Sequence, residues 1–163
     1  MSNRIEKDSM GSLDVPKDAL YGPQTQRAIN NFPVSGRTMP AAFIRALLLV
    51  KRSAAEANYV LDLLPKDMCE AIVASVDDLL LDDRLMINFP VDIYQTGSGT
   101  SSNMNANEVL ATLASRRLGR EVSANDHVNF GQSSNDIIPT AIHVSASIQL
   151  QSGLLPALNY LAI

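Results

Sequence analysis

The stretch AAFIRALLLVKRSAAEANYVLDLL, residues 41–64, predicts a long helix and with it a mainly helical fold. Most of its residues have high helix propensity. Thr38 and Pro40 just before it form a start signal, because threonine is a good N-cap and proline suits the first turn. Pro65 ends the pattern. The apolar positions recur every three or four residues, which is the period of one helix face: Phe43, Leu47, Val50, Ala54 and Ala57.

Three more helices follow from the same kind of signal. The first runs from after Pro65 to about Leu81, with an apolar face of Ile72, Val76 and Leu79. The second runs from about Asn105 to Leu118, because Asn105 and Glu108 have the spacing of a capping box and Gly119 suits the stop. The third starts near Asp136 and continues to the end of the chain, interrupted near Gly153 and Pro156.

The shorter elements are less marked. Residues 12–15, SLDV, alternate as a strand does, and 21–25, YGPQT, form a turn that opens a short helix through Asn31. Residues 82–90 are expected to be irregular. Residues 91–95, VDIYQ, are either a candidate strand or an extended entry to the polar stretch that follows.

Composition narrows the class of protein. The chain has 163 residues, of which 46% are hydrophobic and 18% charged, so a folded domain with a core is expected. A net charge of −4 makes nucleic acid and anionic membrane poor partners. The single cysteine, Cys69, excludes an intrachain disulfide. No signal peptide or apolar run of about 20 residues is present, so a cytoplasmic location is expected.

The end of the chain, LLPALNYLAI at 154–163, has no glycine cap, basic last turn or polar tail. Two interpretations are open: an end that tucks into the core, and an apolar helix that stops before its packing partners. The second is favoured, so the chain is expected to be a fragment.

The polar stretch QTGSGTSSNMNANE, residues 95–108, is the first candidate site. It has no lysine after its last glycine and no third glycine, so it matches neither common nucleotide-binding loop. Its glycines allow close backbone approach, and its hydroxyls and the following helix start can donate hydrogen bonds to an anion. A plain polar turn without a ligand remains an equal alternative.

A second stretch, NDHVNFGQSSNDIIPTAIHV at 125–144, has a similar character. Ser133, Ser134, Asn135 and Asp136 precede an apolar helix, and these residue types also serve as ordinary helix caps. Four in a row exceed what capping requires. Two loops rich in donors, each opening a helix, predict a small anion held between helix ends.

These two stretches carry a family resemblance. TGSGTSSNMNANEVLA (96–111) and VNFGQSSNDIIPTAIHV (128–144) resemble class II fumarases of the fumarase/aspartase superfamily. The similarity extends over the whole chain, through EKDSMGSLDVP (6–16), YGPQTQRAINNFP (21–33) and FPVDIYQTGSGT (89–100). It implies a helical N-terminal lyase domain over residues 1–131, with short strands. Residues 132–163 would then be the first, truncated helix of a central bundle that builds a homotetramer.

The resemblance also implies a reaction: reversible hydration of fumarate to L-malate, a step of the tricarboxylic acid cycle, without metal ion or organic cofactor. It implies that the substrate carboxylates bind to Ser98, Gly99, Thr100, Ser133, Ser134 and Asn135. A secondary anion site would comprise Arg120, Ser123, Asn125 and Asp126, where Ser123 stands in place of the histidine that many relatives carry.

No catalytic residue is expected in these 163 residues, because the family's GSSxMPxKxN loop does not occur in them. His127 is interpreted as a surface residue and His143 as a packing residue. The fragment is therefore expected to be inactive alone. Three alternatives remain open: an aspartate ammonia-lyase of the same superfamily, a non-catalytic helical binding domain, and a plain helical domain without a ligand.

Overall fold

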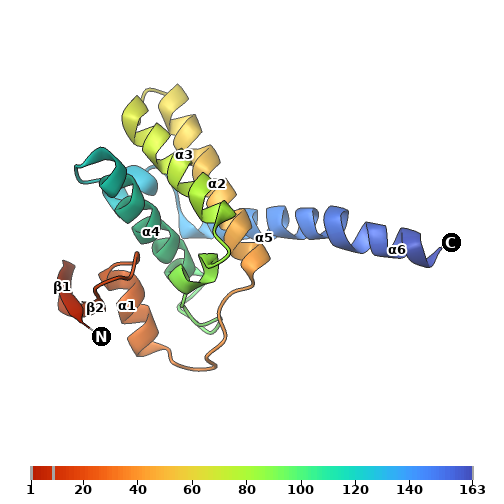
Figure 1. Cartoon of the computed structure of the whole chain (residues 1–163), viewed down its shortest axis with the longest axis horizontal. Coiled ribbons are helices and arrows are strands. Elements are labelled where there is room, and N and C mark those ends of the chain that lie inside the picture. Colours follow the sequence, from red (N-terminus) through yellow and green to blue (C-terminus); the bar gives the residue numbers. More distant parts are fainter. Residues whose placement is uncertain (1, 9, 163) are drawn as a thin grey trace.

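Helices dominate the computed structural model, which describes residues 2–8 and 10–162 (Figure 1). A hairpin of β1 (Asn3–Asp8) and β2 (Gly11–Pro16) precedes them. The α-helices are α1 (Pro23–Asn31), α2 (Ala41–Val60), α3 (Lys66–Leu81), α4 (Thr100–Leu118), α5 (Ser134–Gln149) and α6 (Leu155–Leu161). Single turns of other helix types are η1 (Leu85–Asn88), of the 3₁₀ type, and η2 (Ala124–Val128) and η3 (Leu150–Leu154), of the π type.

The core lies where α2, α3, α4 and the first half of α5 pack together. Its centre is aliphatic: Ile44, Leu47, Leu48, Ile72, Val76, Val109 and Leu110 are fully buried. Alanines 106, 114 and 141 lie between them on α4 and α5 and leave room for close helix approach. The mainly helical prediction is confirmed.

Helix α2 ends at Val60, four residues before the predicted end. Asp62 adopts the left-handed conformation, with φ of 59°, and the N–H groups of Leu63 and Leu64 both donate to the carbonyl of Asn58. This turn satisfies the last carbonyls and stops the helix before Pro65 does. The predicted apolar face was also partly wrong, because Ala57 is exposed.

The predicted strand at 12–15 is confirmed as part of β2, and its antiparallel partner β1 was not predicted. The guanidinium of Arg4, on β1, donates to the carbonyls of Pro16, Lys17, Ala19 and Tyr21 and so ties the hairpin to the segment that leads into α1.

The candidate strand at 91–95 was wrong: the structure has one isolated bridge there, between Thr38 and Asp92. The Asp92 carboxylate instead accepts hydrogen bonds from the N–H groups of Ser35, Gly36 and Tyr94, which fold the chain into a bend. Residues 82–90 are irregular apart from η1.

Helix α4 begins at Thr100, five residues earlier than predicted, after Gly99 in a left-handed conformation with φ of 81°. The predicted capping box of Asn105 and Glu108 is therefore wrong. Both residues are buried inside the helix, and Glu108 accepts hydrogen bonds from the first turn of α1, 83 residues or more away in sequence. The predicted stop at Gly119 is confirmed.

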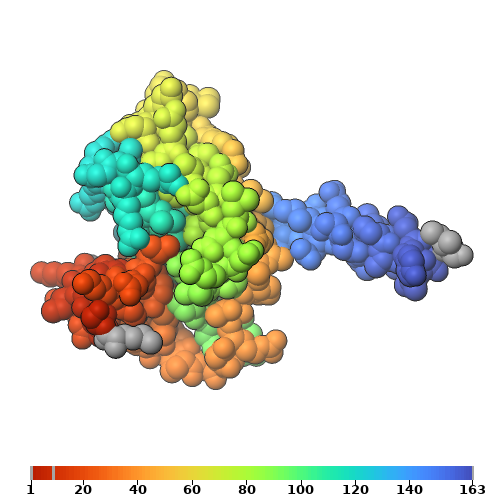
Figure 2. All heavy atoms as spheres, viewed as in Figure 1, coloured from red at the N-terminus to blue at the C-terminus, as the bar shows by residue number. Residues whose placement is uncertain are grey.

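The second half of α5, η3 and α6 form an arm that projects from the rest of the molecule (Figures 1 and 2). The predicted interruption near Gly153 and Pro156 is confirmed as the π-type turn η3, which joins the two helices. Most apolar side chains along the outer arm are exposed: Ile148, Leu150, Leu154, Leu155, Leu158 and Leu161. Among the described residues, no helix combines the length and the apolar character that crossing a membrane requires.

Candidate functional site

The two polar loops meet in space. The hydroxyl of Ser98, before α4, donates to the side-chain oxygen of Asn135, in the first turn of α5, over 2.9 Å. Gly99 lies close to α5 as well: a Cβ atom there would be 3.1 Å from three carbons of Ile138, and the φ of 81° also favours glycine. Ser98 and Asn135, which are 37 residues apart in the sequence, are therefore in contact within one chain.

Helices α4 and α5 both begin at this place, and in the first turn of α4 the N–H of Ser102 already donates to the side-chain oxygen of Gln95. The first turn of a helix lacks internal acceptors for its N–H groups, and the helix dipole adds partial positive charge there. Ser133 caps α5, because its hydroxyl accepts from the N–H of Asn135. Ser133 therefore acts as an ordinary helix cap, which was the alternative interpretation of this stretch. Capping does not account for Ser134 and Asn135.

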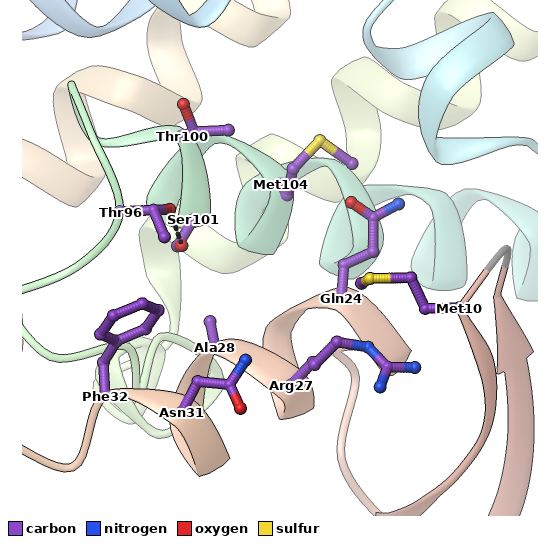
Figure 3. A pocket seen from close by; sticks show the side chains of 10 residues that line it. All are labelled: Met10, Gln24, Arg27, Ala28, Asn31, Phe32, Thr96, Thr100, Ser101 and Met104. Carbon is purple, nitrogen blue, oxygen red and sulfur yellow. Dashed lines mark hydrogen bonds between the residues drawn. The ribbon is translucent and has the colours of Figure 1, made fainter.

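Four of the six candidate substrate-binding residues line two different clefts, and Ser133 and Ser134 line neither of them. Ser98, Gly99 and Asn135 border a cleft of about 450 Å³ whose other walls are mostly apolar, among them Ile138 and Pro139. Thr100 borders a smaller cleft of about 190 Å³ beside Gln24, Arg27 and Asn31 of α1 (Figure 3). In Figure 3, Thr100 lies above the hydrogen-bonded pair Thr96 and Ser101.

Behind the loops lies a buried polar network that the sequence analysis missed. The ammonium group of Lys51, on α2, donates to the side-chain oxygens of Asn129 (2.9 Å) and Gln132 (2.8 Å). The Nδ2 group of Asn103, on α4, donates to Asn129 Oδ1 and to the hydroxyl oxygen of Ser134, both at 3.2 Å. Lys51 is fully buried, and burial lowers its pKa to about 7 by removing water from the charged form.

One signal in the sequence pointed to this lysine. Lys51 lies three and four residues after Leu48 and Leu47, both fully buried, and so falls on the core face of the predicted helix. Charged residues at core positions are rare unless they have a specific role.

The four residues of the predicted secondary anion site are not all joined to one another by hydrogen bonds as the two polar loops are. Arg120 pairs with Asp67 of α3, and this hydrogen bond lowers the pKa of Asp67 despite opposing desolvation. Ser123 and Asp126 bond to each other, since the Ser123 hydroxyl donates to the carboxylate over 2.8 Å and accepts from the Asp126 N–H. Asn125 is exposed.

The sequence predicted His127 as a surface residue and His143 as a packing residue, and neither description fits fully. His127 is half-buried, and its Nδ1 accepts from the N–H of Ser123 over 2.8 Å, so it helps to shape η2. His143 is exposed on α5, so it is not a packing residue within this chain. Over residues 2–8 and 10–162, no cluster of His, Cys, Asp and Glu side chains has the arrangement of a metal site.

Known proteins with similar sequences point to one family. The sequence profile of a family described as "Lyase" matches residues 11–162. The chain is 65% identical, over 158 residues, to "Fumarate hydratase class II 2" of Pseudomonas aeruginosa; the match covers 97% of this chain and 34% of the relative. The chain thus spans about a third of the length of the curated relatives it matches.

Solved structures agree with the sequence matches. A class II fumarase from Schistosoma mansoni superposes with a TM-score of 0.92 at 40% identity, over 98% of this chain and 35% of that one. A fumarate lyase:delta crystallin from Brucella melitensis, in native form, gives 0.86 at 46% identity, over 92% of this chain and 36% of that one.

Proposed function

The chain belongs to this lyase family, and from that premise we propose that it is part of a class II fumarate hydratase, which adds water reversibly to fumarate to give L-malate. The observation that carries the proposal is the hydrogen bond between Ser98 and Asn135, which joins two donor-rich loops at the N-terminal ends of α4 and α5. Fixed donors and two helix starts suit a small carboxylate.

The proposed role of the loops is to hold the substrate carboxylates. Gly99 lets the backbone approach closely, and Thr100 and Ser134 supply hydroxyl groups at the first positions of the two helices. The side-chain oxygen of Asn135 accepts from Ser98, so its Nδ2 group is left to donate to a carboxylate. Ser133 caps α5 and contributes by fixing the direction of its first N–H groups.

Catalysis then follows from where charge develops. In the malate direction, a base removes the proton from the carbon beside one carboxylate, and the electron pair moves into that carboxylate as an aci form. The C–O bond at the neighbouring carbon breaks next, and the hydroxyl leaves as water after protonation. Donors aimed at the aci carboxylate stabilise it more than the ground state, which lowers the barrier. We assign no acid or base to this chain, and we place these groups elsewhere in a longer protein.

The same proposal covers architecture and location. Residues 1–131 would form an N-terminal domain and residues 132–163 the first helix of a central bundle in a homotetramer. The exposed apolar side chains of the arm support this, because leucines in that number are normally covered. We also infer a place in the tricarboxylic acid cycle and the cytoplasm, without metal or organic cofactor. Whether the secondary anion site at Arg120, Ser123, Asn125 and Asp126 exists stays a prediction.

A chimera tests the proposal. This chain replaces the matching segment of the Pseudomonas aeruginosa relative, and hydration is followed by the loss of the ultraviolet absorbance of fumarate. We expect the chimera to hydrate fumarate and the 163-residue chain alone to show no turnover. A chimera that assembles but does not hydrate fumarate would refute the proposal, and release of ammonia from aspartate instead would establish the alternative lyase.

A further inference from the structure

We propose that Lys51 is a positioning residue for carboxylate binding: it sets the direction of the hydrogen bonds in the buried network, so that the hydroxyl hydrogen of Ser134 points to the ligand. The inference rests on the proposed function, because it takes Ser134 to bind a carboxylate. Lys51 itself lies behind the loop and is given no contact with substrate.

The argument begins with the chemistry of lysine, whose ammonium group donates hydrogen bonds and cannot accept them. Both amide partners must therefore turn their oxygens to Lys51. Their NH₂ groups then point away: Asn129 Nδ2 donates to the carbonyl of Gln132 over 3.1 Å, and Gln132 Nε2 donates to the carbonyl of Val128 over 2.8 Å. Each amide is thus held at both ends, which removes the ambiguity of amide orientation.

The orientation of the Asn129 amide in turn determines the donor and acceptor in the hydrogen bonds to α4 and α5. Because the Asn129 oxygen that accepts from Lys51 can only accept, Asn103 can meet it only with its Nδ2 group. The second hydrogen of the same group goes to the oxygen of Ser134. A hydroxyl that already accepts this bond directs its own hydrogen elsewhere, and Ser134 is only half-buried at the start of α5. A carboxylate, which only accepts, is the matching ligand.

Burial makes an incidental role for Lys51 implausible. The side chain is fully buried, and among the described residues no carboxylate forms an ion pair with it. Burial of an ammonium without a counter-charge is costly, and methionine would fill a similar volume without that cost. Loss of the charge does not undo the arrangement, because a neutral amine keeps two N–H groups, enough for both amide oxygens.

The first test uses the 163-residue chain and needs no variant. Scalar couplings across hydrogen bonds, measured by nuclear magnetic resonance, should connect the Lys51 side-chain nitrogen to the side-chain carbonyl carbons of Asn129 and Gln132. In Lys51→Met, the side-chain amide signals of Asn103 and Asn129 should shift, while Lys66→Met, at an exposed lysine, should leave them in place. Absence of the couplings in the unaltered chain would overturn the inference, even if Lys51→Met fails to fold.

The second test uses the chimera and separates positioning from stability. Lys51→Met should raise the KM for fumarate about tenfold, the equivalent of one hydrogen bond to a charged group, and should change kcat less than KM, because Ser134 already holds a carboxylate of fumarate in the ground state. In the Ser134→Ala background, Lys51→Met should add almost nothing to KM. Additive effects would show that Lys51 acts only through the fold.

The two proposals fail in different ways. An active chimera in which Lys51→Met leaves KM unchanged refutes the role of Lys51 and leaves the proposed function intact. A chimera without hydratase activity refutes the proposed function, while the couplings in the 163-residue chain still decide whether Lys51 orders the network.

Discussion

Replacement of Glu108 by glutamine should destabilise the fold more than the small chemical change suggests. The carboxylate, 7% exposed, joins the middle of α4 to the start of α1. One oxygen accepts from the N–H of Gly22 (3.0 Å), the N–H of Thr25 (3.0 Å) and the hydroxyl of Thr25 (2.6 Å). The other accepts from the N–H of Gln24 over 2.9 Å.

The magnitude follows from these four bonds. Glutamine keeps one oxygen, so the best orientation retains the three bonds to Gly22 and Thr25 and turns an NH₂ group to the N–H of Gln24. One charge-assisted bond, worth about 1.5–3 kcal/mol, is lost, and the remaining three fall to roughly half their strength. The negative charge at the start of α1 also disappears. We expect a loss of about 4 kcal/mol in the free energy of unfolding, or a decrease of roughly 8–16 °C in Tm for a chain of this size.

Urea and thermal unfolding, followed by circular dichroism, measure this loss. The matched control is Glu70→Gln, since Glu70 is exposed and its nearest cation is Lys66 at 3.6 Å; a change below about 0.5 kcal/mol is expected there. A second variant checks the geometry: a Cβ atom at Gly22 would lie 2.9 Å from a Glu108 oxygen, so Gly22→Ala should also destabilise. If Glu108→Gln loses less than about 1 kcal/mol, the bond count above does not describe what holds α1 in place.

Three further predictions concern pH and the candidate site. Burial lowers the pKa of Lys51 to about 7 from its ordinary value of 10.5, so between these two pH values the unfolded state binds more protons than the folded state. The free energy of unfolding should therefore rise with pH, relative to that of Lys51→Met, by up to about 1.4 kcal/mol per pH unit. Urea unfolding at several pH values measures this difference. Desolvation raises the pKa of Asp92, but hydrogen bonds from Tyr94, Ser35 and Gly36 outweigh it and lower the pKa to about 2. The stability that this carboxylate contributes is present above its ordinary pKa of 3.8 and is lost as the pH falls to 2. In Asp92→Asn, the free energy of unfolding should therefore change less with pH in that range. In the chimera, Thr100→Ala should reduce turnover much more than it reduces Tm, because Thr100 is exposed and makes few packing contacts.

Each of the three has an outcome that contradicts it. Parallel pH profiles for the unaltered chain and Lys51→Met would show that the buried amine titrates normally. Acid unfolding of Asp92→Asn along the same curve as the unaltered chain would remove that carboxylate from the acid transition. An unchanged turnover number in Thr100→Ala would exclude Thr100 from the site.

Local signals were enough to predict most helices. Period and propensity located α2 and α3, and proline and glycine marked where helices stop, as at Gly119. The errors arose where contacts between residues far apart in the sequence determine the role of a side chain. Glu108 matched a local capping pattern, but its partners lie more than 80 residues earlier, and no window around α4 contains them.

The candidate site was predictable to the same degree. The two loops were recognised from their residue types, and the structure brings them together through Ser98 and Asn135; that they hold an anion stays a prediction. Thr100 on a neighbouring cleft and Lys51 beneath the loops were not foreseen. The cleft at Thr100 depends on how α1 packs against the start of α4, and the partners of Lys51 lie 78 and 81 residues later in the sequence, so local patterns contain neither.

If other copies of the chain cover the arm, as the proposed homotetramer requires, its exposed leucines tie the folding of this chain to its concentration. A helix of this kind gains little from contacts within its own chain, since α6 has no buried residue. Its order then depends on whatever covers it, and binding to the folded state stabilises by mass action. Dilution should fray the arm before it melts the core, so a single unfolding temperature would not describe the molecule. Helicity and midpoint would instead change separately as the protein concentration is varied.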